Sequence, residues 1–310
     1  MPQSTNHRAS STPQSPDEPT TLSRRQLLTG SAALLLGERI VRSQATLSKT
    51  VVFAHTTVIG VDAVQDDVAL AVDGDKIVAI GPTEHVLETY PNADVYDGRG
   101  KALLPGLINC HAHMAAVLAR GFNEDFGFPN SAQLAVRPNS LLKGEEATLM
   151  VTVAALEAIK TGTTTIVENT GNISPNASAL AQTGLRCVFA ESVRDSENVA
   201  GPMSPGGLAN SAPPTFSAQR RDEGVQRIND LFTTWHGKEQ GRITVFPAAA
   251  LAETSSPELL RAIRAFADKH DLGYTIHLSQ SVPEVEFMVR HHGLRPPAFL
   301  DQHGFLGPRL

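Results

Sequence analysis

The spacing of hydrophobic positions changes near residue 140, and the patterns on either side predict different structures. Before that point, short runs rich in Val and Ile are separated by turn signals such as Asp73-Gly74-Asp75. Such runs are typical of strands joined by tight turns. They predict strands over residues 50–59, 68–72 and 76–80, and a hairpin made from 94–96 and 101–104. We therefore expect a small antiparallel unit in the first part of the chain.

Beyond residue 140, helical and strand patterns alternate. Apolar residues recur at helical spacing in 144–160, which predicts a helix that buries one face. That face consists of Leu149, Val153, Leu156 and Ile159. Further strands are predicted over 163–167, 185–190, 243–251 and 273–278, and further helices over 217–235, from Pro257 onward and over 282–292.

This alternation indicates an α/β fold with a parallel sheet. The helix that starts at Pro257 has Ser256 as its capping residue and should bury Leu259, Ile263 and Phe266. A Rossmann-like sheet is the alternative, but no Gly-x-Gly-x-x-Gly motif follows any predicted strand. With the strand that ends at His111, the sequence predicts five successive β-to-α units.

Two histidines one residue apart, His111 and His113, end an apolar run that reads as a buried strand. Side chains at i and i+2 of a strand point to the same face, so both imidazoles can hold one metal ion. Two surface histidines in a loop are the alternative. His277 ends a later predicted strand, and barrel active sites lie at such carboxyl ends. Its alternative role is that of an ordinary core residue.

Residues 102–113, followed by Ala119-Arg120-Gly121, resemble the first metal-binding strand of the amidohydrolase superfamily. The pattern is similar to the branch that contains cytosine deaminases and triazine chlorohydrolases. This resemblance implies a (β/α)8 TIM barrel over residues 106–310, preceded by a small β-sandwich over 46–105. It also implies that His111, His113 and His277 bind one divalent ion, Zn²⁺ or Fe²⁺, which activates water.

Two positions depart from the family pattern. The family usually has a proton-shuttling glutamate three residues after the third ligand, and this chain has Gln280. An amide cannot titrate, so we expect Gln280 to orient water or substrate rather than to act as a general acid. Glu284 and Glu286 are expected to be ordinary first-turn acids of the next helix. Ala250 stands where adenosine-type deaminases carry a histidine, which argues against a nucleoside deaminase of that type.

Other polar positions have weaker interpretations. Glu168, Glu191 and Glu253 lie near predicted strand ends, where each could contact a substrate amine, but a salt bridge is the preferred role. The segment 198–214 is rich in Gly, Pro and Ser and could act as a lid. Three further histidines are expected to be exposed to solvent: His291, His292 and His303.

The family also takes a fourth histidine from its sixth strand and an aspartate from its eighth. The given sequence ends at Leu310, in what resembles the lead-in to the sixth strand. We therefore expect an incomplete barrel and low activity of this chain alone. The expected reaction is metal-dependent hydrolysis of a non-peptide C–N bond, or of an aryl chloride, on a nitrogen heterocycle. A truncated or non-catalytic remnant is the alternative, and a solute-binding protein would leave the histidine pair unexplained.

The first 45 residues resemble a twin-arginine export signal. Arg24 and Arg25 precede a mild apolar run, 27–37, which is too short for a membrane span. We expect an exported or periplasmic protein, or a cytoplasmic one if the signal is not used. The net charge of −6 suggests no nucleic-acid partner. Cys110 and Cys187 are expected to be small buried thiols, and a homo-oligomer is among the states that the sequence allows.

Overall fold

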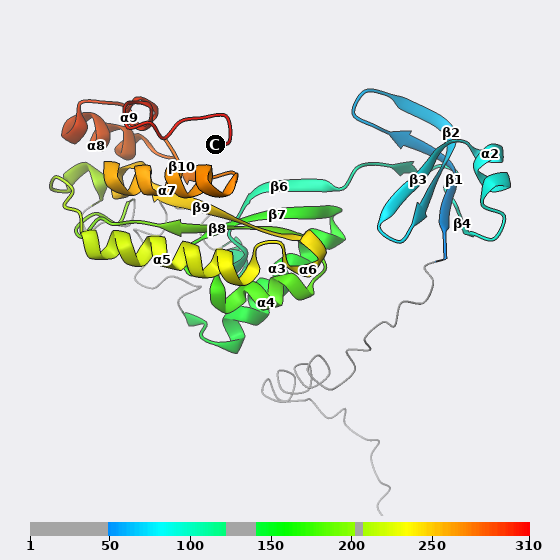
Figure 1. Cartoon of the computed structure of the whole chain (residues 1–310), viewed down its shortest axis with the longest axis horizontal. Helices are drawn as coiled ribbons and strands as arrows, with labels where there is room; N and C mark the ends of the chain where they lie inside the picture. The colour runs from blue at the N-terminus through cyan, green and yellow to red at the C-terminus, as the bar shows by residue number, and fades with distance from the viewer. Residues whose placement is uncertain (1–48, 122–140, 202–206) are drawn as a thin grey trace, which may run out of the picture. The chain divides into compact units, whose positions relative to one another are not determined.

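The computed structural model describes residues 49–121, 141–201 and 207–310 (Figure 1). The predicted export signal therefore lies outside the described residues. The chain divides into two compact units, one ending at Leu103 and the other running from Leu104 to Leu310. Each unit has its own hydrophobic core, so each is described by itself.

In its described residues, the first unit is a five-stranded sheet with one helix on it. Three strands form an antiparallel meander: β1 (Val51–Ile59), β2 (Val64–Asp73) and β3 (Lys76–Pro82). The helix α2 (Thr83–Thr89) was not predicted, and its Val86 is buried with Val52, Ala54, Ala69 and Ala71. These core positions alternate along β1 and β2, as expected for strands that bury one face.

The prediction that residues 94–96 and 101–104 form a hairpin is wrong. β4 (Asp94–Asp97) and β5 (Ala102–Leu103) do not pair with each other; both pair in parallel with β1, at opposite ends of that strand. Between them, the N–H of Gly98 donates to the carbonyl of Ala54. A Cβ at Gly98 would lie 2.7 Å from that of Thr56, so only glycine fits this close crossing.

The second unit is a curled parallel sheet with helices packed along it (Figure 1). Its strand order is β10-β9-β8-β7-β6, and the strands are β6 (Leu107–Ala112), β7 (Thr163–Thr170), β8 (Arg186–Val193), β9 (Ile243–Leu251) and β10 (Thr275–His277). The helices are α3 (Glu145–Lys160), α4 (Ser174–Gln182), α5 (Ala218–Trp235), α6 (Lys238–Gly241), α7 (Pro257–His270), α8 (Val282–His292) and α9 (Pro296–Gln302). Short 3-10 turns complete it: η1 (Met114–Ala119), η5 (Leu208–Asn210) and η6 (Ala252–Thr254). This is the predicted incomplete barrel of five β/α units.

The helices of the second unit bury the apolar faces that their sequences predict, with one exception. In α7, Leu259 and Ile263 are fully buried and Phe266 packs against the same core. In α3, however, Leu149, Leu156 and Ile159 are at least 36% exposed, and the buried residues are instead Val151 and Ala155. The helical period of α3 was predicted correctly, but the side of the helix that is buried was not.

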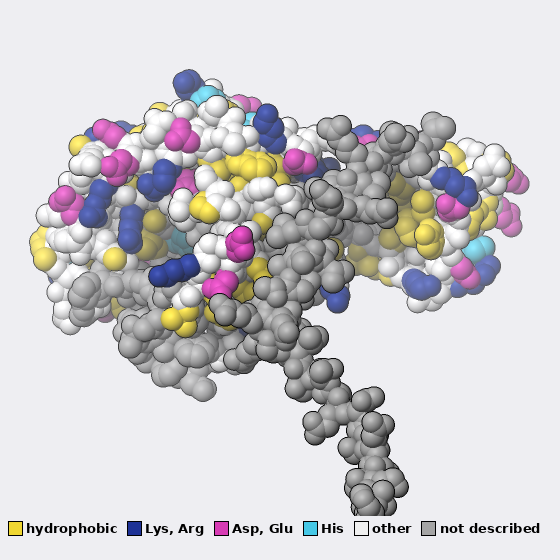
Figure 2. Space-filling view, turned by 90° about the horizontal axis from the view of Figure 1, so that it is seen from below, with side chains coloured by type: hydrophobic (Ala, Val, Ile, Leu, Met, Phe, Trp, Pro, Cys, Tyr) yellow, Lys and Arg dark blue, Asp and Glu magenta, His cyan; other side chains and the backbone are white. Residues whose placement is uncertain are grey.

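The strand that carries the first histidines is also exposed, contrary to expectation. Leu107 is 56% and Ile108 65% exposed, because β6 is an edge strand of the sheet among the described residues. Hydrophobic side chains reach the surface of both units (Figure 2). In the part of the chain that the structure describes, no helix has the length and apolar character needed to cross a membrane.

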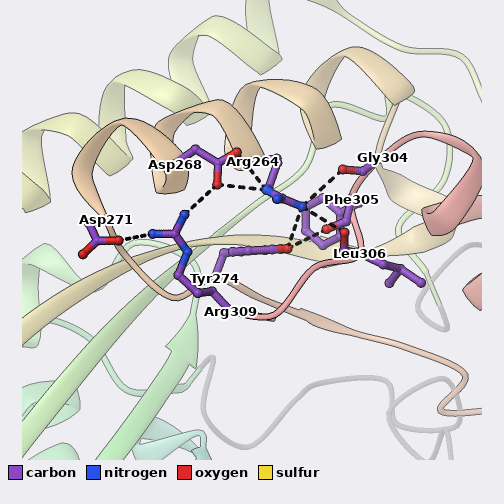
Figure 3. A network of polar contacts seen from close by, with 8 residues as sticks. All are labelled: Arg264, Asp268, Asp271, Tyr274, Gly304, Phe305, Leu306 and Arg309. Atoms are coloured by element: carbon purple, nitrogen blue, oxygen red, sulfur yellow. Dashed lines mark hydrogen bonds and ion pairs between the residues drawn. The ribbon is translucent and has the colours of Figure 1, made fainter.

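The last residues of the chain are bound to α7 and β10 by a polar network (Figure 3). The guanidinium of Arg264 donates to the carbonyl of Leu306 at 2.9 Å, and the hydroxyl of Tyr274 donates to that of Phe305 at 2.8 Å. Arg309 forms ion pairs with Asp268 and Asp271. The backbone N–H of Tyr274, the residue before β10, also donates to the carbonyl of Arg309.

Candidate metal centre

Three histidines meet at the carboxyl end of the parallel sheet. His111 lies in β6, His113 directly follows that strand, and His277 ends β10. Nε2 of His113 is 3.2 Å from Nε2 of His111 and 3.3 Å from Nε2 of His277. The structure thus brings together all three residues that the sequence singled out as metal ligands, and they form a group suited to a metal ion.

The curl of the sheet makes this meeting possible. β6 and β10 are the two edges of the sheet, with three strands between them. In a flat sheet these edges would be about 19 Å apart, four spacings of about 4.8 Å. Side chains from both edges nevertheless approach to 3.3 Å, because the strands wrap around a common interior.

Burial favours the neutral form of His113 and His277, and a hydrogen bond sets the tautomer of His277. Nδ1 of His277 is 2.8 Å from the carbonyl of Ala250; a carbonyl only accepts, so Nδ1 carries the proton and the lone pair of Nε2 faces the cluster. Burial, followed by the adjacent His277 and His111, lowers the pKa of His113 to about 4, although a hydrogen bond to the backbone of Asn169 opposes this. Burial also lowers the pKa of His277. A neutral imidazole is the form that binds metal.

The geometry of the nitrogens fits a tetrahedral metal ion. With Zn–N bonds of about 2.0–2.1 Å, two ligands of a tetrahedral zinc are about 3.3 Å apart. The observed separations of 3.2 and 3.3 Å match that edge length. The lone pair on Nε2 of His277 faces Nε2 of His113 at 3.3 Å, and a cation between the rings would bind the lone pairs of both nitrogens.

Gln280 follows the cluster in an exposed turn. Its backbone N–H donates to Oε2 of Glu284 at 2.7 Å, and Ser279 donates to Oε1 at the same distance. Ser279 has a φ of +54°, a left-handed conformation that a non-glycine residue rarely adopts. The position of Gln280 neither supports nor contradicts its predicted catalytic role. Glu284, in contrast, is fully buried, so it is not the ordinary first-turn acid that the sequence predicted.

The three carboxylates near strand ends have different roles. Glu191 forms the expected salt bridge, to Nε of Arg227 at 3.3 Å, and also accepts two backbone N–H groups. Glu168 instead accepts the N–H of Met114, directly after His113, and burial raises its pKa to about 7. Glu253 is buried, and no hydrogen-bond partner of either oxygen is found among the described residues. The salt-bridge interpretation is therefore wrong for Glu168 and Glu253.

Several expectations of exposure are also corrected. His291, His292 and His303 are half-buried, because their rings pack at an angle against the rings of Phe287 or Phe299. Cys187 is buried as expected, but Cys110 is exposed on the open edge strand.

The predicted lid, 198–214, is partly outside the described residues, at 202–206. Its described ends are fixed: the amide of Asn198 bonds to Pro213 and Thr215, while Val199 and Leu208 are buried in the core.

Near the cluster, sequence reasoning named Glu284 but assigned it the wrong role, and it did not single out Asn169. Glu284 had a local signal, because Ser281 and Glu284 form the Ser-x-x-Glu pattern of a capping box. Asn169 had none: its side-chain amide is buried and unpartnered among the described residues, and its backbone bonds to His113. The burial of Glu284 and of Asn169 depends on contacts that exist only in the folded chain.

Residues 102–308 match the amidohydrolase family, and residues 69–93 match an imidazolonepropionase-like composite domain of bacteria. The chain is similar to 5'-deoxyadenosine deaminase of Methanobrevibacter smithii, with 30% identity over 77% of this chain and 50% of that protein. It is also 28% identical to 5-methylthioadenosine/S-adenosylhomocysteine deaminase of Carboxydothermus hydrogenoformans, over 82% of this chain and 54% of the relative. The chain thus spans about half the length of the curated relatives it matches.

Solved structures share the fold. An adenosine deaminase from Xanthomonas campestris with bound zinc superposes with a TM-score of 0.69 at 24% identity, covering 84% of this chain and 56% of the other. Atrazine chlorohydrolase from Arthrobacter aurescens, complexed with zinc, gives 0.66 at 22% identity, covering 84% and 59%.

Proposed function

Because this chain belongs to the amidohydrolase family, we propose that its three converging histidines bind one divalent metal ion in a hydrolase site. The observation that carries the proposal is the approach of three Nε2 atoms from two separate strands to 3.2 and 3.3 Å. A hydrogen bond between two rings accounts for one pair at a time, whereas a shared cation accounts for the convergence of all three imidazoles.

Zinc is the proposed ion, with Fe²⁺ as the alternative. Three neutral nitrogen ligands suit either ion, and the nitrogen separations fit the bond lengths of zinc. Two structural neighbours are named with zinc, which supports this choice. When bound, such an ion supplies Lewis acidity that lowers the pKa of water towards neutrality.

The chain's own residues would orient the reaction. His111, His113 and His277 hold the ion, and the carbonyl of Ala250 fixes the tautomer of His277. Gln280 is proposed to orient water or substrate, since its amide can donate and accept hydrogen bonds but cannot transfer a proton.

The proposed substrate is a nitrogen heterocycle that loses an amino group or a chloride. Curated relatives named as deaminases of adenosine derivatives, and a neighbour named as a chlorohydrolase, support that class. Ala250 at the position of the family histidine favours a substrate other than an ordinary nucleoside. The chain spans about half the length of its relatives, so this activity is proposed for the whole protein. The alternative is a non-catalytic remnant.

Zinc binding is the first test. The full chain, freed of metal and titrated with Zn²⁺ against a chelator, should bind about one ion. Replacing His277 with alanine should weaken affinity more than about 100-fold, because even a lost outer-shell partner costs about 10–100-fold. His291→Ala is the matched control: its ring packs on Phe287, outside the cluster. Equal zinc affinity in His277→Ala and wild type would refute the site.

Release of ammonia or chloride separates the catalytic proposal from its alternative. The zinc-loaded chain is incubated with 5'-deoxyadenosine, 5-methylthioadenosine and atrazine. We expect low turnover, lost in His277→Ala. A zinc-bound chain that releases neither product supports the non-catalytic alternative, and rapid turnover would contradict the expectation of low activity.

Two further properties are proposed from the sequence. The paired arginines at positions 24 and 25 support export by a twin-arginine route, and cell fractionation would refute this if the chain stays in the cytoplasm. Exposed apolar residues on β6 and α3 support a homo-oligomer.

A further inference from the structure

Glu284 joins the start of α8 to the turn that follows His277. Its Oε1 accepts the N–H of Ser279 and its Oε2 that of Gln280, both at 2.7 Å. A further backbone bond comes from Ser281, whose hydroxyl in turn accepts the N–H of Glu284. An ordinary capping box reaches back only to the capping residue. Here the carboxylate reaches two residues farther, towards the metal ligand.

The turn held by this carboxylate would otherwise be free to adopt other conformations. Ser279 has a φ of +54°, a left-handed backbone conformation that is unfavourable for a residue with a side chain. Leu278, between His277 and Ser279, packs against the core. The ligand strand is thus fixed on one side by the bond from His277 to Ala250 and on the other by Glu284.

The buried carboxylate of Glu284 has its charge compensated by backbone donors. Its side chain is fully buried, and burial raises its pKa while the N–H groups of Ser279, Gln280 and Ser281 lower it. Glu253, also buried, has its pKa raised to about 8 by burial and by the proximity of Glu284. Of these two neighbouring buried acids, Glu284 has backbone donors on both oxygens and Glu253 has no partner among the described residues, so a charge is better compensated on Glu284.

We propose that Glu284 is a positioning residue of the metal centre, which fixes the turn 278–281 and thereby the orientation of His277 and Gln280. This inference rests on the proposed metal-binding function. Loss of a residue that orients a metal ligand without touching the metal typically costs about 10–100-fold in metal affinity.

The test compares Glu284→Gln with Glu286→Gln in the full chain. Glu286 is an exposed acid on the same helix, so its variant has the same loss of charge without the turn contacts. We expect Glu284→Gln to weaken zinc binding about tenfold in chelator competition, and to speed amide exchange of Ser279 and Gln280. Glu286→Gln should leave both unchanged.

Ser281→Ala separates positioning from helix stability. It removes the hydroxyl that caps α8 but leaves both carboxylate oxygens of Glu284 on the turn. It should lower the unfolding temperature with zinc affinity within about twofold of wild type. If zinc affinity follows the unfolding temperature in both variants, the role is structural and the proposal is overturned.

Glu284→Asp keeps the measurement possible if Glu284→Gln does not fold. It retains the charge but shortens the reach by one methylene, and should show a smaller loss of zinc affinity. Zinc affinity equal to wild type in the folded Glu284 variants overturns the positioning role alone. A wild-type chain that binds no zinc overturns the proposed function itself, and with it this inference.

Discussion

At the scale of single residues, Glu253 connects stability to pH. Its carboxyl is buried, no partner for it is found among the described residues, and burial together with Glu284 raises its pKa to about 8. The ordinary value in an unfolded chain is 4.5. Between these two values the unfolded chain has released this proton and the folded chain has kept it. This group therefore makes the folded state less stable as pH rises through that window.

Replacing Glu253 with glutamine should remove that dependence. The free energy of unfolding, measured in urea at pH 5, 6, 7 and 8, should fall relative to the variant by up to roughly 1.4 kcal/mol per pH unit in the wild type. The amide keeps the size of the side chain and has no proton to release in this range. Glu286→Gln, at an exposed position of α8, should leave the pH profile unchanged. Parallel profiles of wild type and Glu253→Gln would contradict the assignment.

At the scale of elements, the start of α7 depends on a contact between distant parts of the chain. Ser256 caps the helix by accepting the N–H of Leu259 at 3.0 Å, and Pro257 occupies the first helical position. The buried carboxylate of Asp195, after β8, accepts both the N–H and the hydroxyl of Ser256. The sequence showed the serine and the proline, but the acid lies 61 positions away.

Ser256→Ala should therefore cost more than loss of an ordinary cap. A lost cap alone costs about 1 kcal/mol, and leaving Oδ2 of the buried Asp195 carboxylate without its hydroxyl donor adds about 1–3 kcal/mol, although Oδ1 keeps the backbone N–H. Ser217→Ala is the control, because Ser217 caps α5 through a 3.3 Å bond from Arg220. Denaturant unfolding should show a loss of about 2–4 kcal/mol for Ser256→Ala and about 1 for Ser217→Ala. Equal losses would show that Asp195 adds nothing.

At the scale of the whole molecule, the second unit exposes apolar side chains that its sequence pattern would bury. Leu156 is 48% and Ile159 38% exposed on α3, and Ile108 is 65% exposed on the edge strand β6. Apolar surface of this kind favours association, and an unpaired strand edge does the same.

Charging the exposed face of α3 should reduce self-association. The double replacement Leu156→Lys and Ile159→Lys should shift the chain towards monomer in sedimentation velocity across a concentration series. Because both side chains are exposed, stability should change by less than about 1 kcal/mol. Val61→Lys, at a residue 93% exposed in the first unit, should leave association unchanged. A double variant that associates as the wild type does would show that α3 is not involved.

The order of elements and the three histidines could be predicted from the sequence, because both depend on short-range patterns. Strand and helix periods set β9 and α8 at their observed bounds, and the i, i+2 spacing placed His111 and His113 on one side. Local periodicity does not say which strands are neighbours, so the parallel pairing of β4 and β5 with β1 was missed.

Only the tertiary structure decided how those pieces form a site. The curl of the parallel sheet brings His277 from one edge to the histidines of the other, 164 positions away. The same folding buries Glu284 beneath the turn and leaves the predicted inner face of α3 exposed. A sequence period specifies that a side chain faces one way within its own element. What that face meets depends on elements far away in the chain, and burial, pKa and metal geometry all follow from that meeting.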